Sequence, residues 1–192
     1  MKTAITGGIG SGKSYVCSLL RERGISVYDC DTAAKRIMRT SAAIQSRLAR
    51  LVGHNLYAGG RLNKSVMATY ILSSAENAAR VNAIVHPAVA EDFLSSGADF
   101  MECAILFESG FDRLVDRVVA VTAPLETRVS RIMSRDGITE QKAREWIGCQ
   151  MPQEEMARRS DCVICNDGIA PLDRQIDKVL EMLSQSADTA ER

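Results

Sequence analysis

The stretch Thr3-Ala4-Ile5-Thr6-Gly7-Gly8-Ile9-Gly10-Ser11-Gly12-Lys13-Ser14 decides the fold. A short β-prone run, Thr3–Thr6, leads into the pattern G-x-x-x-x-G-K-[ST], and a helical pattern follows. Glycines let backbone N–H groups curl around phosphate oxygens, and a helix N-terminus adds partial positive charge. Lys13 can reach the β- and γ-phosphates, and the Ser14 hydroxyl can ligate Mg²⁺. A glycine-rich turn with a surface lysine is the alternative, which the strand–loop–helix context disfavours. The stretch therefore predicts a nucleotide site without naming the reaction.

The length, composition and net charge of the chain limit the class of protein. The chain has 192 residues, so one compact unit with a small appendage is expected, since domains average roughly 150 residues. Apolar residues make up 46% and charged residues 25%, which excludes intrinsic disorder as the main state. Lys plus Arg and Asp plus Glu each number 24, so no net basic field draws the chain onto nucleic acid or an anionic membrane. We therefore expect neither nucleic acid nor a membrane as a partner.

The location is predicted to be cytoplasmic. No apolar run approaches the roughly 18–20 residues of a membrane span, and the first strand leaves no room for a signal peptide. Six cysteines are spread along the chain in mostly apolar surroundings, which favours reduced thiols over a disulfide framework. Cys162 and Cys165 form a C-x-x-C pair, but Val163-Ile164 between them and the lack of a second pair favour two small apolar residues of a buried strand over a metal or redox site.

Alternating strand and helix patterns predict a doubly wound α/β core with a parallel sheet. Between most of the predicted strands, apolar residues recur at helical spacing. Pro124 is expected in the first turn of one of these helices, and Arg23-Gly24 at the end of another. The five predicted strands are Thr3–Thr6, Ile25–Cys30, Glu102–Phe107, Arg117–Thr122 and Cys162–Cys165.

Two segments interrupt this alternation. Residues 32–99 show several helical patterns, around Ile44–Val52, Val66–Leu72, Glu76–Val85 and Ala88–Leu94, and are too long for one crossover helix. They predict a helical subdomain over the edge of the sheet where ligands bind. Residues 128–159 are rich in basic residues and predict a lid. The nucleotide-binding core then comprises residues 1–31, 100–127 and 160–192.

Two carboxylates and one histidine are further candidates. Asp31, at the end of the second strand, can accept the proton of an attacking hydroxyl or hold a water on Mg²⁺; it can equally cap the helix that begins at Thr32. Glu108 ends a predicted buried strand where a Walker-B acid usually sits, and either a role around the metal or simple solvation of the strand end explains it. His86 precedes Pro87 at a predicted helix junction, where a histidine is more often a structural hydrogen-bonding group than a catalyst.

Taken in order, the motifs resemble one family, and the resemblance covers nearly the whole chain. After the glycine-rich stretch, the order and spacing of its later motifs are similar to those of dephospho-CoA kinases. Those motifs are Asp29-Cys30-Asp31, Ile84-Val85-His86-Pro87, Leu106-Phe107-Glu108, Arg135-Asp136-Gly137, Gln150 and Asn166-Asp167-Gly168. Tyr15 and Trp146 depart from the usual pattern, and Trp146 stands where an arginine is frequent. The resemblance implies a P-loop NTPase-type sheet flanked by helices, with a helical CoA-binding insertion (32–99) and a lid (128–159).

The family transfers the γ-phosphoryl group of ATP to the ribose 3′-hydroxyl of dephospho-CoA, with Mg²⁺ as cofactor. The resemblance implies catalytic roles for Asp31, Lys13 and Arg135, acceptor contacts from Asp31, His86 and Glu108, and a metal ligand in Ser14. The implied ATP-binding residues are Gly8, Ile9, Gly10, Ser11, Gly12, Lys13, Ser14, Tyr15, Arg131, Asn166 and Gly168. A monomer or weak homo-oligomer is expected.

Two other functions are open to a chain with this loop. A P-loop kinase for another nucleoside or nucleotide shares the core but differs in the helical block, where Ile84–Pro87 favours the CoA family. A nucleotide-switched binding protein is disfavoured, because the guanine-reading N-K-x-D motif is missing: Asn63-Lys64 is followed by Ser65-Val66.

Overall fold

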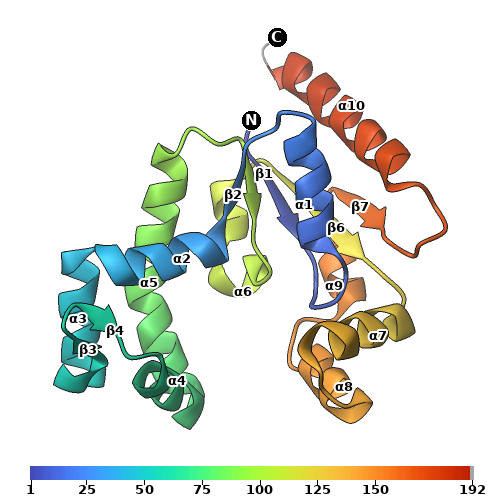
Figure 1. Cartoon of the computed structure of the whole chain (residues 1–192). Coiled ribbons are helices and arrows are strands. Elements are labelled where there is room, and N and C mark those ends of the chain that lie inside the picture. The colour runs from blue at the N-terminus through green and yellow to red at the C-terminus, as the bar shows by residue number, and fades with distance from the viewer. Residues whose placement is uncertain (191–192) are drawn as a thin grey trace. The chain divides into compact units, whose positions relative to one another are not determined.

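Figure 1 shows a computed structural model of the chain, which describes the backbone of residues 1–190 and the side chains up to residue 185. The chain forms two compact units, which are described separately. One unit comprises residues 1–28 and the residues from Ala98 onward, and the other comprises Asp29–Gly97.

A five-stranded sheet with the order β2-β5-β1-β6-β7 organises the first unit. Its strands are β1 (Thr3–Thr6), β2 (Val27–Asp29), β5 (Phe100–Glu102), β6 (Arg117–Thr122) and β7 (Cys162–Cys165). Strand β1 lies in the centre, is buried along its whole length, and pairs in parallel with β5 on one side and β6 on the other. Because the chain leaves β1 between two parallel neighbours, the loop that follows lies at a topological switch point, where ligands bind in open α/β sheets. The predicted parallel sheet is confirmed.

Helices cover this sheet, and two of them share a core with it. The apolar stripe of α1 (Lys13–Glu22) packs on β1, β6 and β7 together with α10 (Leu172–Ala190) (Figure 1). The buried members of this core are Ile5, Val16, Cys17, Leu19, Leu20, Val119, Val121, Ile164 and Ile176. Three further helices follow β6: α7 (Leu125–Asp136), α8 (Glu140–Gly148) and α9 (Gln153–Arg158). Pro124 is the residue before α7 rather than part of its first turn.

Two predicted strands differ from the observed ones in their bounds, and a third differs in burial. The second predicted strand, Ile25–Cys30, is shorter in the structure, where β2 covers Val27–Asp29. The third predicted strand, Glu102–Phe107, is wrong: β5 ends at Glu102, and the apolar residues after it lead into the short helix α6 (Leu106–Ser109). Apolar periodicity does not distinguish a buried strand from a buried turn and helix, and this run serves the second purpose. Strand β7 is an edge strand, so the side chain of Val163 is 45% exposed instead of buried.

The second unit is mainly helical. Its helices are α2 (Cys30–Thr40), α3 (Ala42–Val52), α4 (Lys64–Ser73) and α5 (Ala75–Ser95). A short hairpin of β3 (Tyr57–Ala58) and β4 (Arg61–Leu62), which the sequence analysis missed, turns at Gly59-Gly60 with positive φ at both glycines. Positive φ at both central residues is the requirement of a two-residue type I′ turn.

Helix α5 runs through the predicted junction at His86-Pro87, so that prediction is wrong. An interior proline costs a helix about 3 kcal/mol, because it removes one hydrogen bond and its ring meets the preceding turn. Here every fourth residue on both sides of Pro87 is buried, which offsets that cost by packing. The buried residues are Val81, Val85, Val89 and Phe93.

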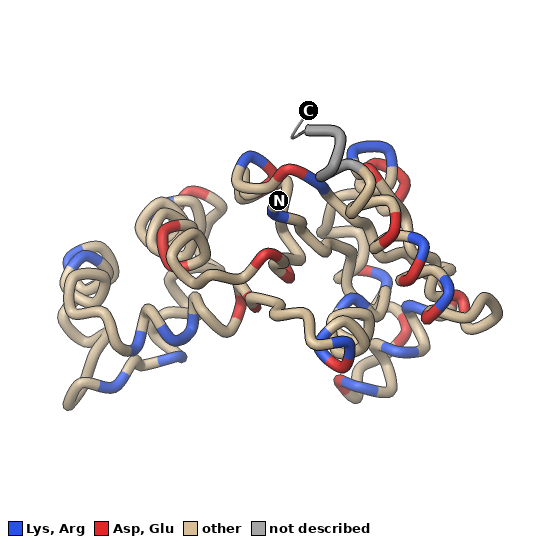
Figure 2. Tube along the Cα trace, turned by 90° about the horizontal axis from the view of Figure 1, so that it is seen from above, with Lys and Arg blue, Asp and Glu red and all other residues tan. Residues whose placement is uncertain are grey.

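Charge is distributed unevenly along the chain, and the thiols differ in exposure. Residues 32–75 contain seven basic residues and no acidic one, although the chain as a whole has 24 of each sign (Figure 2). Cys17, Cys30 and Cys103 are buried, Cys162 and Cys165 are partly buried, and Cys149 is exposed. Among the described residues, none of the helices combines the length and apolar character that crossing a membrane requires.

Candidate active site

The loop between β1 and α1 depends on glycine at its last position. Gly12 has φ +87° and precedes the first residue of α1. A methyl group built on Gly12 would lie 2.0 Å from Asn166 Nδ2, so a larger residue fails both on backbone conformation and on space. No described side chain caps this helix. Tyr15 N and Val16 N donate to Gly12 O at 3.0 and 3.1 Å, so the N–H groups of Lys13 and Ser14 before them are the donors that the helix itself leaves unpaired. These two donors and the positive end of the helix dipole make an anion site.

Three successive carbonyl groups of the loop are held from its other side. Arg128 Nε donates to Ile9 O at 2.9 Å, and Arg131 Nη1 donates to the carbonyls of Gly10 and Ser11, both at 3.3 Å. Asn166 Nδ2 also donates to Ser11 O, at 2.9 Å. Because the carbonyls are bound on this side, the loop is fixed in a shape that leaves N–H groups at the helix start available to a phosphate.

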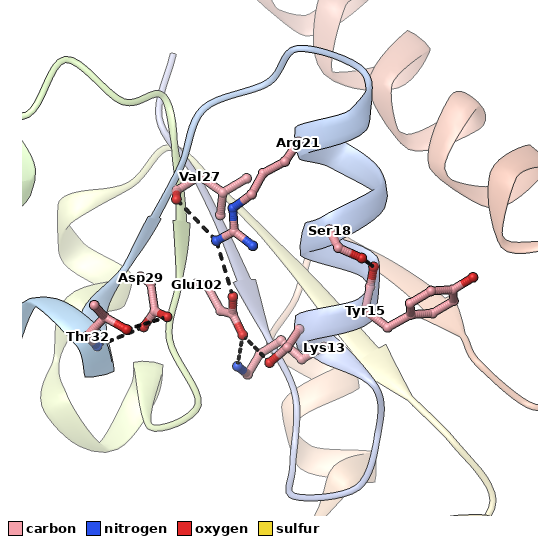
Figure 3. Close-up of polar contacts among 9 residues, drawn as sticks. Lys13, Tyr15, Ser18, Arg21, Val27, Asp29, Thr32 and Glu102 are labelled. Atoms are coloured by element: carbon pink, nitrogen blue, oxygen red, sulfur yellow. Dashed lines mark hydrogen bonds and ion pairs between the residues drawn. The ribbon is translucent and has the colours of Figure 1, made fainter.

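Lys13 and Ser14 meet on one buried carboxylate (Figure 3). Lys13 Nζ and Ser14 Oγ both donate to Glu102 Oε1, each at 2.6 Å. Glu102 ends β5, the strand beside β1, and is 6% exposed. The arrangement brings a cation, a hydroxyl and a carboxylate to the end of the phosphate loop.

The second oxygen of Glu102 faces Arg21, which lies two turns after Ser14 on the same face of α1. Arg21 Nη2 lies 3.6 Å from Glu102 Oε2 and donates to Val27 O at 3.3 Å (Figure 3). Burial alone raises the pKa of Glu102, but the hydrogen bond and charge of Lys13, together with hydrogen bonds from Ser14 and Cys17, outweigh burial and hold that pKa below its ordinary value. Burial and the neighbouring Glu102 raise the pKa of the Cys17 thiol to about 12. Glu102 is therefore the ionised partner and Cys17 a neutral donor.

Glu102 is not among the predicted site residues. The predicted strand begins there and ends five residues later, which places Glu108 at the sheet edge. The structure places Glu108 in α6 with its side chain exposed. One signal could have found Glu102: it is the only charged residue in the apolar stretch 100–107, and a charge inside a buried parallel strand needs a partner.

Other predicted nucleotide contacts fall into two groups. Arg131 and Asn166 touch the loop and each other, with Arg131 Nη2 3.2 Å from both Asn166 O and Asn166 Oδ1. Arg135, in the last turn of α7, points to Asp136, to which its Nη2 donates at 2.7 Å. Tyr15 is 58% exposed and its ring points away from Glu102 (Figure 3). Gly168 follows β7 with φ +83° in an exposed turn.

Asp31 and His86 belong to the other unit. Of the two roles left open for Asp31, capping of the following helix is excluded, because Asp29 is the cap of α2: its carboxylate accepts from Thr32 N at 2.9 Å and from Thr32 Oγ1 at 2.8 Å. Asp31 lies in the first turn of α2 with its side chain exposed. His86 is half-buried within α5, and burial lowers the pKa of its imidazole.

The site residues of the first unit are suited to bind a nucleoside triphosphate together with a hard divalent cation. A lysine and uncapped helix N–H groups bind phosphate, while a serine hydroxyl beside a carboxylate offers the oxygen ligands that Mg²⁺ prefers. The side-chain hydroxyl of Ser11, within the loop, is buried and has no hydrogen-bond partner among the described residues, as is also true of Thr3 and Thr6 in β1.

Comparison with known proteins agrees with this geometry. The family model described as dephospho-CoA kinase matches residues 1–171. A dephospho-CoA kinase of Bacteroides fragilis is 44% identical over 96% of this chain and 94% of its own. A crystal structure from Thermus thermophilus, 35% identical, covers 95% of this chain and 97% of its own with a TM-score of 0.81.

A dephospho-CoA kinase from Campylobacter jejuni has the same fold, with a TM-score of 0.69 at 21% identity over 97% of this chain and all of its own. The phosphate loop on β1, the buried carboxylate on β5 and the match of the family model to nearly the whole sequence lead to one assignment: the chain belongs to the dephospho-CoA kinase family.

Proposed function

We propose that the protein transfers the γ-phosphoryl group of ATP to the ribose 3′-hydroxyl of dephospho-CoA, giving coenzyme A and ADP. The bond between the γ-phosphorus and the 3′-oxygen forms as the bond to the β–γ bridging oxygen breaks, and the hydroxyl proton passes to a carboxylate. One observation supports the donor half of this proposal above the others: Lys13 and Ser14 share Glu102 Oε1 beside a phosphate loop with an uncapped helix start.

On the donor side, this chain's residues bind and orient. The loop N–H groups and Lys13 bind the phosphates, with Lys13 positioned to neutralise charge that develops at the β–γ bridge. Glu102 keeps the ammonium and the Ser14 hydroxyl side by side. Ser14 would hold Mg²⁺, which supplies charge neutralisation at the β- and γ-oxygens. Arg131 and Asn166 hold the loop, and Asn166 and Gly168 lie near the adenine.

On the acceptor side, the proposal assigns the 29–97 unit to dephospho-CoA. Asp31 accepts the proton of the attacking hydroxyl, and His86 and Glu108 contact the acceptor. Residues 128–159 form a lid that brings Arg135 to the phosphates when its contact with Asp136 opens. Since Asp29 caps α2, the Asp31 carboxylate is not needed for the helix start and is available for chemistry.

The wider setting belongs to the same proposal. ATP and dephospho-CoA are the two substrates, with neither nucleic acid nor membrane as a partner. The protein acts in the cytoplasm as a monomer or a weak homo-oligomer.

A coupled assay of ADP release tests the acceptor. Dephospho-CoA, adenosine and nucleoside monophosphates are compared side by side with ATP and Mg²⁺ in excess. The proposal expects turnover with dephospho-CoA and little with the others. Preferred turnover of a nucleoside or nucleotide would instead establish the alternative, a P-loop kinase for a different small acceptor.

A further inference from the structure

The peptide unit of Ile9, in the middle of the phosphate loop, is bound at both of its polar groups by side chains. Ile9 N donates to Gln150 Oε1 at 2.7 Å, and Ile9 O accepts from Arg128 Nε at 2.9 Å. Arg128 lies in the first turns of α7, and Gln150 follows α8. The two anchoring residues therefore come from opposite ends of the 128–150 segment.

The side chain of Ile9 is fixed by the same segment. It packs on a small core inside the pair α7 and α8, whose buried members are Val129, Ile132 and Ala143. Donor, acceptor and side chain of one loop residue thus all face residues 128–150. We call Arg128, Gln150 and this small core the Ile9 anchor.

Arg128 makes its hydrogen bond to Ile9 from a buried position. Arg128 is 5% exposed, and burial lowers the pKa of its guanidinium. An arginine is rarely buried to this extent without partners, so its position here needs a reason. A methyl group built on Gly8 would lie 2.5 Å from Arg128 Nη2 and 3.3 Å from Gln150 Oε1. Glycine at position 8 leaves the space that the two anchoring side chains occupy.

The loop needs such support for an entropic reason. Four of the six residues 7–12 are glycines, and glycine loses more backbone freedom on ordering than any other residue. Ile9 is the one large apolar side chain in this stretch, so it is the natural point at which to immobilise the loop.

We propose that Arg128 and Gln150 are positioning residues for nucleotide binding, which hold the Ile9 peptide so that the loop presents its N–H groups in the phosphate-binding shape before the nucleotide arrives. The inference rests on the proposed function for the identity of the nucleotide, and it adds a coupling: the loop and the 128–150 segment move together. Neither residue needs to touch the nucleotide.

Four variants test the anchor, with ADP and Mg²⁺ as the probe in titration calorimetry. Arg128→Met and Gln150→Leu keep side-chain volume but remove the donor or the acceptor, and each is expected to weaken ADP binding about tenfold, as for the loss of a buried hydrogen bond. Arg128→Lys keeps a donor and Gln150→Glu keeps an acceptor, so both are expected to retain most of the affinity. The KM for ATP should rise, while that for dephospho-CoA should stay within about twofold, because the anchor acts on the loop alone.

A double variant and hydrogen exchange distinguish positioning from general stability. Since both residues hold one peptide, Arg128→Met with Gln150→Leu should cost about as much affinity as either alone, instead of the product of the two losses. Amide exchange in residues 7–12 should speed up in the single variants. Arg144→Met, which lies in the same segment and breaks exposed ion pairs to Glu126 and Glu140, is the matched control and should change neither affinity nor exchange.

Folded Arg128→Met and Gln150→Leu variants that bind ADP as tightly as the wild type would overturn the inference, as would losses that multiply in the double variant. A lowered Tm with unchanged affinity would show a merely structural role. Failure of the proposed function would give a different result. If the wild-type protein binds ADP but does not phosphorylate dephospho-CoA, the acceptor assignment is wrong, and the ADP affinities of the variants still test the role of Arg128 and Gln150.

Discussion

In this structure Glu102 occupies the groups that we propose to bind phosphate and metal. Lys13 Nζ and Ser14 Oγ both rest on its Oε1, while Arg21 faces its Oε2. Removing a partner from a buried charge is costly, since the remaining charge is left without compensation. At the scale of single residues, this cluster and Asp31 are where substitutions are most informative.

Glu102→Gln should change the acid stability of the protein. The pKa of Glu102 is lowered in the folded state, so its stabilising contribution is complete above the ordinary value near 4.5 and is lost as pH falls through the folded value. The wild type should melt higher than the variant at pH 6, and the difference in Tm should shrink below about pH 4. Thermal unfolding between pH 3 and 7 measures this. A difference that stays constant on acidification would contradict it.

Lys13→Ala should remove most phosphoryl transfer. Loss of one preorganised charge-stabilising group costs about 10²–10³-fold in kcat. Lys142→Ala, on the exposed face of α8, is the matched control and should keep normal turnover. Steady-state kinetics on folded protein, checked by circular dichroism, makes the comparison. Near-normal turnover of a folded Lys13→Ala variant would exclude the proposed site.

Asp31→Asn should lower kcat about 10²-fold, as for loss of a general base, and leave nucleotide affinity unchanged. Asn retains the size of the side chain but is not an anionic base. Because Asp29 caps α2, the Tm should change little. Kinetics and thermal melts on the same preparation decide: a variant with normal turnover would remove Asp31 from the chemistry, whatever its Tm.

At the scale of elements, the start of α2 separates two neighbouring aspartates. Asp29→Ala removes the side-chain acceptor for Thr32 N and should destabilise the protein by about 1 kcal/mol. For a chain of this length that corresponds to a fall in Tm of about 2–4 °C. Asp31→Asn is its internal control and should shift the Tm less. If Asp31→Asn is the more destabilising of the two, the assignment of the cap is wrong.

The local sequence predicted those elements in which the apolar pattern mostly agrees with the burial seen in the structure. Thr3–Thr6, Arg117–Thr122 and Cys162–Cys165 are strands with the predicted bounds, and the glycine-rich loop lies between β1 and α1 as predicted. The end of β5 was not predictable from periodicity, since the apolar residues after Glu102 continue without a break into a buried turn. The helix junction predicted at Pro87 was wrong for a different reason. Packing on both sides of Pro87 outweighs its local preference to end a helix, and that packing exists only in the tertiary structure.

The same limit applies to the site. Loop residues and Ser14 follow from one local motif, so they were predictable. Glu102, Arg128 and Gln150 reach the loop across 88, 119 and 141 positions of sequence, and no local pattern encodes such contacts.

At the scale of the whole molecule, nucleotide binding should stabilise the fold. A ligand that binds the folded state at 100 times its Kd adds about 2.7 kcal/mol, which for this length raises the Tm by about 5–10 °C. We expect this shift with ATP or ADP and Mg²⁺, a smaller one after chelation of the metal, and none for Lys13→Ala at the same concentration. Differential scanning fluorimetry measures it. An unchanged Tm of the wild type at saturating nucleotide would contradict a nucleotide site.

The uneven exposure of the thiols has a practical consequence for spectroscopy. Cys149 is exposed and adjoins Gln150, whereas Cys17 is buried with a pKa raised to about 12, so it carries almost no thiolate at neutral pH. A maleimide dye should therefore attach to Cys149 first, without prior removal of Cys17. That places a fluorescent or spin label one residue from the anchor of the phosphate loop, where it can report in real time on whether the 128–150 segment moves as nucleotide binds.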